Sequence, residues 1–327
     1  MDSRERVIRA IEFDLPDRIP ITNAALPAAF SKYGGRLGRI FASYPSDFGA
    51  NRPPSTYPEQ AYFTGRRKTY VDEWGCEWSM IRRGIMGQVK GHPLSELGAL
   101  ETYRFPRIPE KKYSLGDGGN LFERMQWLRG FENLMVDLVA GRKEAFLIRD
   151  EIVKYNLELA KRSIEIGADG ICFADDWGTQ RGLMISPPLW RKFFKPAYGR
   201  MFGEVKKARK HVFFHSDGYI VDIIPDLIEL GVDVLAEAEL QVNGIDSLAA
   251  KFGGRVCFLG NLDTQWILPF GSAEDVKRHA LHALSALGCH DGGFIGDFEV
   301  HPDIPLSNVR AAFEAFAKYG RYPVARA

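Results

Sequence analysis

Six short apolar runs in this chain each stop at an acid, a histidine or an amide. Runs that are apolar on both faces are typical of parallel strands covered on both sides. Polar groups just past the carboxyl ends of such strands are where an α/β barrel carries its chemistry. The runs and the polar residues that follow them are Ile19–Thr22 before Asn23, Gly170–Ala174 before Asp175 and Asp176, Val212–Phe214 before His215, Val232–Ala236 before Glu237, Val256–Leu259 before Gly260 and Asn261, and Phe294–Ile295 before Gly296 and Asp297.

Helix-like segments follow several of these runs, so the pattern predicts either a closed (β/α)8 TIM barrel or an open doubly wound sheet. An open sheet usually has a Gly-rich phosphate loop after its first strand, and none is present here. We therefore expect the barrel. The length of 327 residues fits one barrel with additions, so a single domain over residues 1–327 is expected.

Residues 24–66 break the regular alternation, because they are rich in Pro, Gly, Ser and aromatic residues. Such a long irregular excursion is expected to form a lid or a wall near the barrel mouth. Residues 68–80, with aromatic and β-branched residues around Gly75, predict a strand or hairpin.

Bulk charge excludes several classes of partner. The 43 basic and 42 acidic residues nearly cancel, which argues against nucleic acid or a charged membrane surface. No stretch of about 18 apolar residues is present to span a bilayer.

The N-terminal segment and the cysteines bear on where the protein is located. The first residues lack the apolar core of a secretory signal, and the four cysteines form no CxxC pair. We expect a cytoplasmic protein with reduced thiols.

The segment His215-Ser216-Asp217 is the sharpest local signal for chemistry. Alternation at a strand end sends His215 and Asp217 to the same side, where they could grip a divalent metal. An imidazole with carboxylates suits Zn²⁺, which takes three protein ligands in catalytic sites. A further ligand would come from another strand end, either Glu237 or Glu239 on the next strand or Asp297 or Glu299 on the last. The expected set is His215, Asp217, Glu239 and Glu299. The alternative is that His215 hydrogen-bonds Asp217 or Asp176 and only shapes the pocket.

The adjacent pair Asp175 and Asp176 gives the candidate catalytic residues, together with His215. At least one carboxyl is expected to point into the mouth, where burial or the neighbouring carboxylate would raise its pKa for acid catalysis. Equally, one carboxylate could cap the next segment through backbone N–H groups while the other pairs with Arg181.

Aromatic and amide residues near the same strand ends are candidates for substrate binding. Aromatic rings there suit a flat substrate, although rings at strand ends also serve packing. The residues from Asn261 to Gln265 could equally form a turn and a helix cap. The expected substrate-binding residues are Asn23, Trp177, Tyr219, Asn261 and Phe298.

At this level of detail the sequence resembles the uroporphyrinogen decarboxylase superfamily. The resemblance implies a (β/α)8 barrel. It also implies one of two activities: a cofactor-free porphyrinogen decarboxylase, or a methyltransferase that serves a corrinoid protein. The segments that carry it span nearly the whole chain: Asp17–Ile21, Ala174–Gln180, Ile185–Phe193, His215–Gly218, Gly260–Gln265 and Pro302–Val309.

Departures from the family pattern favour the second branch. The decarboxylases open with a Gln-Ala-Gly-Arg-Tyr stretch, whereas residues 23–27 here contain no arginine, and Phe298 stands where those enzymes carry a histidine. A substrate with eight carboxylates needs a basic floor, and the inferred mouth is acidic. The zinc methyltransferases use His-x-Cys and a later Cys. Here Asp217 and Phe298 occupy the two cysteine places, so a thiolate zinc site is not preserved.

The motifs Asp-Asp-x-Gly-Thr-Gln and His-Ser-x-Gly resemble those of corrinoid-dependent O-demethylases. The resemblance implies transfer of a methyl group from a small methylated, methoxylated substrate to a corrinoid carried by a partner protein. Zinc or a protonated carboxylic acid would assist at the ether oxygen. Two alternatives stay open: a decarboxylase-type lyase, if Arg82, Arg83 or Arg181 converge on the mouth, and a non-catalytic ligand-binding barrel.

Overall fold

The computed structural model describes residues 1–49, 69–72, 74–79, 87–105 and 111–324, apart from the side chains of Glu237, Ala238 and Asn261. The chain divides into two compact units, where we expected one domain. The first, the barrel unit, comprises Met1–Asn51 and Lys111–Ala327, and the second, the insert, comprises Arg52–Glu110.

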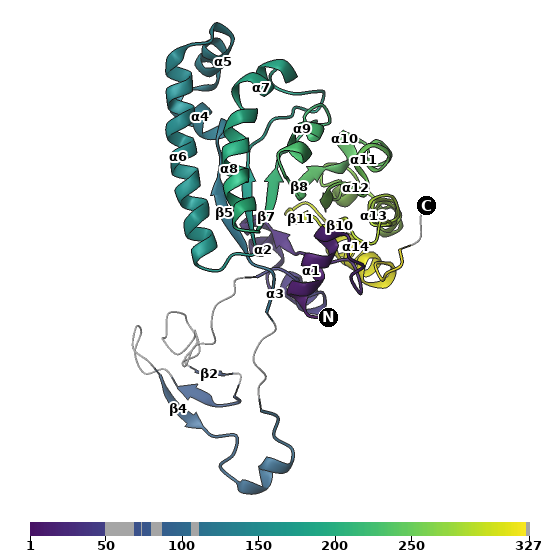
Figure 1. Cartoon of the computed structure of the whole chain (residues 1–327). Coiled ribbons are helices and arrows are strands. Elements are labelled where there is room, and N and C mark those ends of the chain that lie inside the picture. The colour runs from purple at the N-terminus through teal and green to yellow at the C-terminus, as the bar shows by residue number, and fades with distance from the viewer. Residues whose placement is uncertain (50–68, 73, 80–86, 106–110, 325–327) are drawn as a thin grey trace. The chain divides into compact units, whose positions relative to one another are not determined.

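The barrel unit is built on six parallel strands in the order β10-β9-β8-β7-β6-β5. Five of them coincide with the apolar runs predicted above, and their residues are largely buried because helices cover them from outside (Figure 1). The strands are β5 (Leu115–Gly119), β6 (Gly170–Ala174), β7 (His211–His215), β8 (Val234–Glu239), β9 (Cys257–Asn261) and β10 (Phe294–Asp297).

Two short segments close this sheet into a ring. Ile21 bridges Gly296 in parallel, which places the first apolar run beside β10, and Phe48 bridges Tyr113 in parallel, just before β5. The amide of Asp47 donates to the carbonyl of Ile21 at 2.8 Å, which joins the two segments. In the described part of the chain, six strands and two bridged segments therefore make the eight positions of a (β/α)8 barrel, as predicted.

Helices surround the ring, and α6 illustrates why they form. Its buried residues Ile152, Val153, Asn156, Ala160 and Ser163 recur at helical spacing, so one face packs inward. The helices are α1 (Ser3–Glu12), α4 (Phe122–Arg129), α5 (Phe131–Ala140), α6 (Lys143–Glu165), α7 (Pro187–Phe193), α8 (Lys195–Lys207), α9 (Ile224–Glu229), α10 (Leu240–Asn243), α11 (Ile245–Phe252), α12 (Ile267–Phe270), α13 (Ala273–Leu287) and α14 (Leu306–Tyr319).

The expected irregular excursion is wrong for residues 24–43. They form β1 (Ala24–Ala25), which pairs with β11 (Glu299–Val300), and then α2 (Pro27–Tyr33) and α3 (Gly35–Ser43). Proline suits the first turn of a helix, and Leu37 and Ile40 are buried against the core, so this segment gains ordinary helical packing. Residues 50–66 lie outside the described residues, so a lid there stays a prediction.

The insert contains an antiparallel sheet of three strands, β2 (Thr69–Val71), β3 (Glu77–Ser79) and β4 (Gln88–Gly91). Tyr70 pairs with Trp78 across β2 and β3, and their rings stack with centroids 6.0 Å apart. This confirms the predicted hairpin. A 3-10 helix follows at Leu97–Glu101. None of the helices in the described ranges has the length and apolar character needed to cross a bilayer.

Candidate metal and active site

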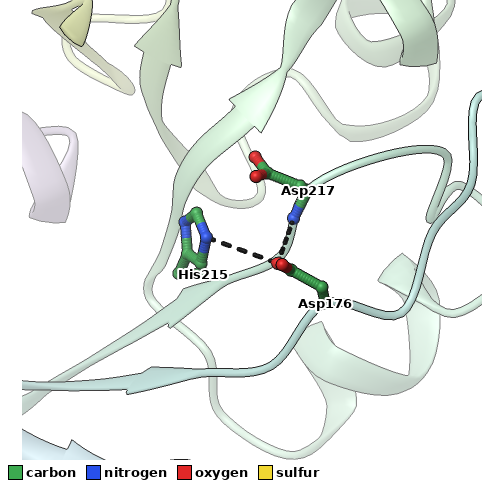
Figure 2. A group of neighbouring side chains, drawn as sticks. All are labelled: Asp176, His215 and Asp217. Atoms are coloured by element: carbon green, nitrogen blue, oxygen red, sulfur yellow. Dashed lines mark hydrogen bonds and ion pairs between the residues drawn. The ribbon is translucent and has the colours of Figure 1, made fainter. Parts of the chain in front are cut away.

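The carboxyl ends of β6 and β7 bring Asp176, His215 and Asp217 together (Figure 2). One potential ligand atom from each of the three lies within 4.8 Å of the other two. His215 Nε2 is 3.5 Å from Asp176 Oδ1, and the backbone N–H of Asp217 donates to the same oxygen at 3.0 Å. The prediction that His215 and Asp217 share one small volume is confirmed, and Asp176 joins them.

Backbone contacts between the two strand ends fix this grouping. The N–H of Gly178 donates to the carbonyl of Asp217 at 3.2 Å, and the N–H of Tyr219 donates to that of Thr179 at 2.9 Å. The loops can lie this close because Gly178 and Gly218 carry no Cβ: on either glycine it would meet the other loop's backbone at 2.4 Å. The glycines of the Asp-Asp-x-Gly and His-Ser-x-Gly motifs therefore permit the close loop contact that keeps Asp176, His215 and Asp217 together.

The chemistry of this group fits a divalent cation held by nitrogen and oxygen. The hydrogen bond from His215 and that from the Asp217 amide hold the pKa of Asp176 below its ordinary value, so its carboxylate is ionised and suited to bind a cation. One imidazole and two carboxylates match the ligand classes of Zn²⁺. Burial raises the pKa of Cys257 far above its ordinary value, which makes a thiolate ligand from that strand unfavourable.

Asp175 faces a different part of the molecule from Asp176. Its fully buried carboxylate accepts hydrogen bonds from the N–H groups of Leu121 and Glu123 at 2.8 and 2.9 Å and from Tyr198 Oη at 2.6 Å. It therefore caps the start of α4, the alternative weighed for one member of the pair. Burial raises its pKa to about 7.

Glu239 and Glu299 do not belong to the three-residue group among the described residues. Glu299 Oε2 lies 3.1 Å from His301 Nε2 instead. Glu239 is nevertheless adjacent to the group, because its Oε2 accepts the N–H of Gly218 at 3.0 Å. The side chain of Glu237, also considered as a ligand, lies outside the described residues.

The candidate substrate-binding residues are not gathered in one place. Trp177 and Phe298 are fully buried: Trp177 stacks on Phe122 with centroids 3.9 Å apart, and Phe298 packs on Phe313 at 4.8 Å. In this structure both rings are packing residues. Tyr219 is half-buried against the core, and Asn23 Nδ2 donates to the carbonyl of Tyr44 at 3.0 Å. Asn261 ends β9, with its side chain outside the described residues.

A cavity of about 330 Å³ has Glu239 in its wall, and Glu239 in turn contacts the backbone of Gly218 next to the candidate metal site. Glu239 accepts hydrogen bonds from Gln180 Nε2 at 3.2 Å and from Gln265 Nε2 at 2.7 Å. Asp263 Oδ1 accepts the N–H groups of Gln265 and Trp266, which confirms the turn read from this segment. Both glutamines were missed as site residues. The repeated Thr-Gln at positions 179–180 and 264–265 is the signal that could have pointed to them.

Comparisons with known proteins place this geometry in a family. No curated protein sequence matches the chain. A methyltransferase from Methanosarcina mazei shares the fold, with a TM-score of 0.65 and 17% sequence identity over 98% of this chain and 99% of the other. A dihydropteroate synthetase structure aligns over 41% of the chain with a TM-score of 0.28, too low to support any argument. Residues 125–319, more than half of the chain, match the uroporphyrinogen decarboxylase (URO-D) family. The chain therefore belongs to the uroporphyrinogen decarboxylase family.

Proposed function

We propose that this protein is a methyltransferase that moves a methyl group from a small methoxylated substrate to a corrinoid carried by a partner protein. The observation that carries the proposal is the group Asp176, His215 and Asp217, whose ligand atoms lie within 4.8 Å of one another at the ends of β6 and β7. Family membership and the fold shared with the M. mazei methyltransferase support it.

The chemistry requires help at the ether oxygen. The reduced Co(I) corrinoid would supply the electron pair for the new bond to the methyl carbon. The oxygen keeps the pair of the bond that breaks, so it leaves as an alkoxide or phenoxide. A zinc ion held by Asp176, His215 and Asp217 would supply a Lewis acid for that charge. Without a bound ion, His215 would instead polarise the ether oxygen directly, with its Nε2 3.5 Å from Asp176 Oδ1.

The roles of the two adjacent acids then differ. The low pKa of Asp176 makes it a poor proton donor and a good partner for a cation or an imidazolium. Asp175 has the raised pKa expected of an acid catalyst, but its oxygens are occupied by the amides of α4 and by Tyr198. We therefore assign Asp175 to positioning Asp176 rather than to proton transfer.

Of the two alternative functions, the decarboxylase is the less well supported. Among the described residues, no lysine, arginine or histidine lines the cavity that contains Glu239, and a substrate with many carboxylates requires such groups. Arg82 and Arg83 lie outside the described residues. A ligand-binding barrel without activity would explain the fold but would leave the clustered Asp176, His215 and Asp217 without a role.

Methyl transfer to chemically reduced free cobalamin, with 2-methoxyphenol as donor, tests the proposal. Purified protein is assayed for catechol by mass spectrometry and for bound metal by elemental analysis. We expect H215A to reduce product formation by about 100-fold or more and to lower the metal content while the fold is retained. H282A, which removes an exposed histidine on α13, is the matched control. Undiminished turnover by H215A would refute this assignment.

A further inference from the structure

The cavity that Glu239 lines has walls whose side chains are oriented by hydrogen bonds to that carboxylate. Glu239 receives one N–H from Gln180, one from Gln265 and one from the backbone of Gly218. A carboxylate offers about four acceptor positions, so most of its capacity is filled within the protein. Glu239 thus acts as a fixed anchor for the two glutamines.

This anchoring decides which atoms the glutamines present to a ligand. Each side chain has an amino end that donates and a carbonyl end that accepts. Because an ionised Glu239 only accepts, it selects the amino ends of Gln180 and Gln265, which directs both carbonyl oxygens away from Glu239. The cavity is therefore biased toward groups that donate hydrogen bonds, such as hydroxyls.

The charge and the shape of the cavity walls also favour an uncharged ligand with a hydroxyl group. In the part of the chain that the structure describes, the lining holds Glu239 and Asp263 and no basic side chain. Trp266, 69% exposed, adds an aromatic surface on which a ring could pack. The volume of about 330 Å³ is at the small end of the range for ligand pockets. An anionic ligand would face uncompensated negative charge here, whereas an uncharged aromatic alcohol would not.

We propose that this cavity, formed around Glu239, Gln180 and Gln265 with Trp266 at its wall, binds an uncharged hydroxylated methoxy-aromatic compound and discriminates against its carboxylated analogue. The inference rests on the proposed methyltransferase function, for which it names the substrate class. Glu239 and the two glutamines act as specificity residues in it.

Isothermal titration calorimetry with two compounds of matched shape tests the inference without any turnover. The compounds are 4-hydroxy-3-methoxybenzyl alcohol and 4-hydroxy-3-methoxybenzoate, which differ in one substituent, an uncharged hydroxymethyl group against a carboxylate. We expect the wild-type protein to bind the alcohol about tenfold more tightly than the benzoate. Repulsion between the benzoate carboxylate and one nearby negative charge is enough to produce a difference of this size. Equal or tighter binding of the benzoate, or binding of neither compound, would overturn the inference.

Two variants locate the effect. E239Q removes the charge and should bring the two affinities to within about threefold of each other. Because that change could also disturb the glutamines, Q241K provides a second route: Gln241 is an exposed lining residue, and a lysine there should favour the benzoate. If both variants kept the wild-type preference for the alcohol over the benzoate, the preference would not arise in this cavity, and the role of Glu239 would be refuted. Normal discrimination without any methyl transfer would instead refute only the proposed function.

Discussion

The backbones of Gly178 and Gly218 approach so closely that a Cβ on Gly218 would come within 2.4 Å of the Gly178 carbonyl carbon. Gly218 also has a φ of +75°, a backbone conformation that residues with a Cβ rarely adopt. The contact joins the loop that follows Asp176 to the loop that carries Asp217. The geometry of the candidate metal site therefore depends on two residues that have no side chain.

G218A is expected to destabilise the fold by about 2–4 kcal/mol, from the left-handed backbone and the overpacked contact together. Urea unfolding followed by circular dichroism measures the change. G203A is the matched control, because Gly203 lies in α8 and its added Cβ would point into open space beyond the backbone of its own helix. That variant should gain up to about 1 kcal/mol from helix propensity. A G218A protein as stable as the wild type would contradict the close contact.

Tyr198 connects Asp175 to the core beneath the site. Its hydroxyl donates to Asp175 Oδ2 at 2.6 Å and accepts from Trp177 Nε1 at 3.0 Å, and both side chains are buried. Y198F removes both bonds and leaves two buried polar groups without this partner, so a loss of about 1–3 kcal/mol in unfolding free energy is expected. Y155F changes an exposed tyrosine of α6 and should shift stability by less than about 0.5 kcal/mol. Similar values for the two variants would argue against the buried network.

The strands, and His215 and Asp217 at the end of one, could be predicted because apolar runs and strand alternation are local properties. The choice between Asp175 and Asp176 was not predictable, since it depends on the backbone path after β6 and on the distant amides of Leu121 and Glu123 that capture Asp175. The glutamines on Glu239 come from 59 and 26 residues away in the chain, beyond any spacing rule. Phe48 closes the ring through a single bridge, too short to leave a strand pattern.

His279 on α13 is expected to make stability depend on pH. Its Nε2 accepts the N–H of Asp263 at 3.2 Å, which requires the unprotonated nitrogen, and burial lowers the pKa of the imidazole from its ordinary value. Between that lowered pKa and the unfolded value of about 6.5, the unfolded chain binds more protons than the folded one. Unfolding free energy should therefore fall as pH drops below about 6.5.

H279Q should flatten this dependence, because a glutamine oxygen accepts the same N–H without titrating. Urea unfolding at several pH values between about 5 and 7.5 measures the slope for each protein. H282Q serves as the control: it alters an exposed neighbour whose charge contributes least to the lowered pKa of His279, so most of the slope should remain. An equal slope in wild type and H279Q would remove His279 as its source.

Asp47 holds the closure of the barrel, because it is fully buried beside the segment that contains Phe48. Its Oδ1 accepts from Arg6 Nη1 at 2.7 Å, and its Oδ2 accepts from Arg18 Nη1 at 2.8 Å and from the N–H of Ile21 at 2.9 Å. D47A leaves the buried guanidinium of Arg6 with Asp17 as its remaining carboxylate partner and the amide of Ile21 without this acceptor, so a loss of about 3 kcal/mol in unfolding free energy is expected. D14A removes an exposed partner of Arg9 and should cost less than about 1 kcal/mol. If urea unfolding gave D47A and D14A the same stability, the ring would not depend on this buried carboxylate.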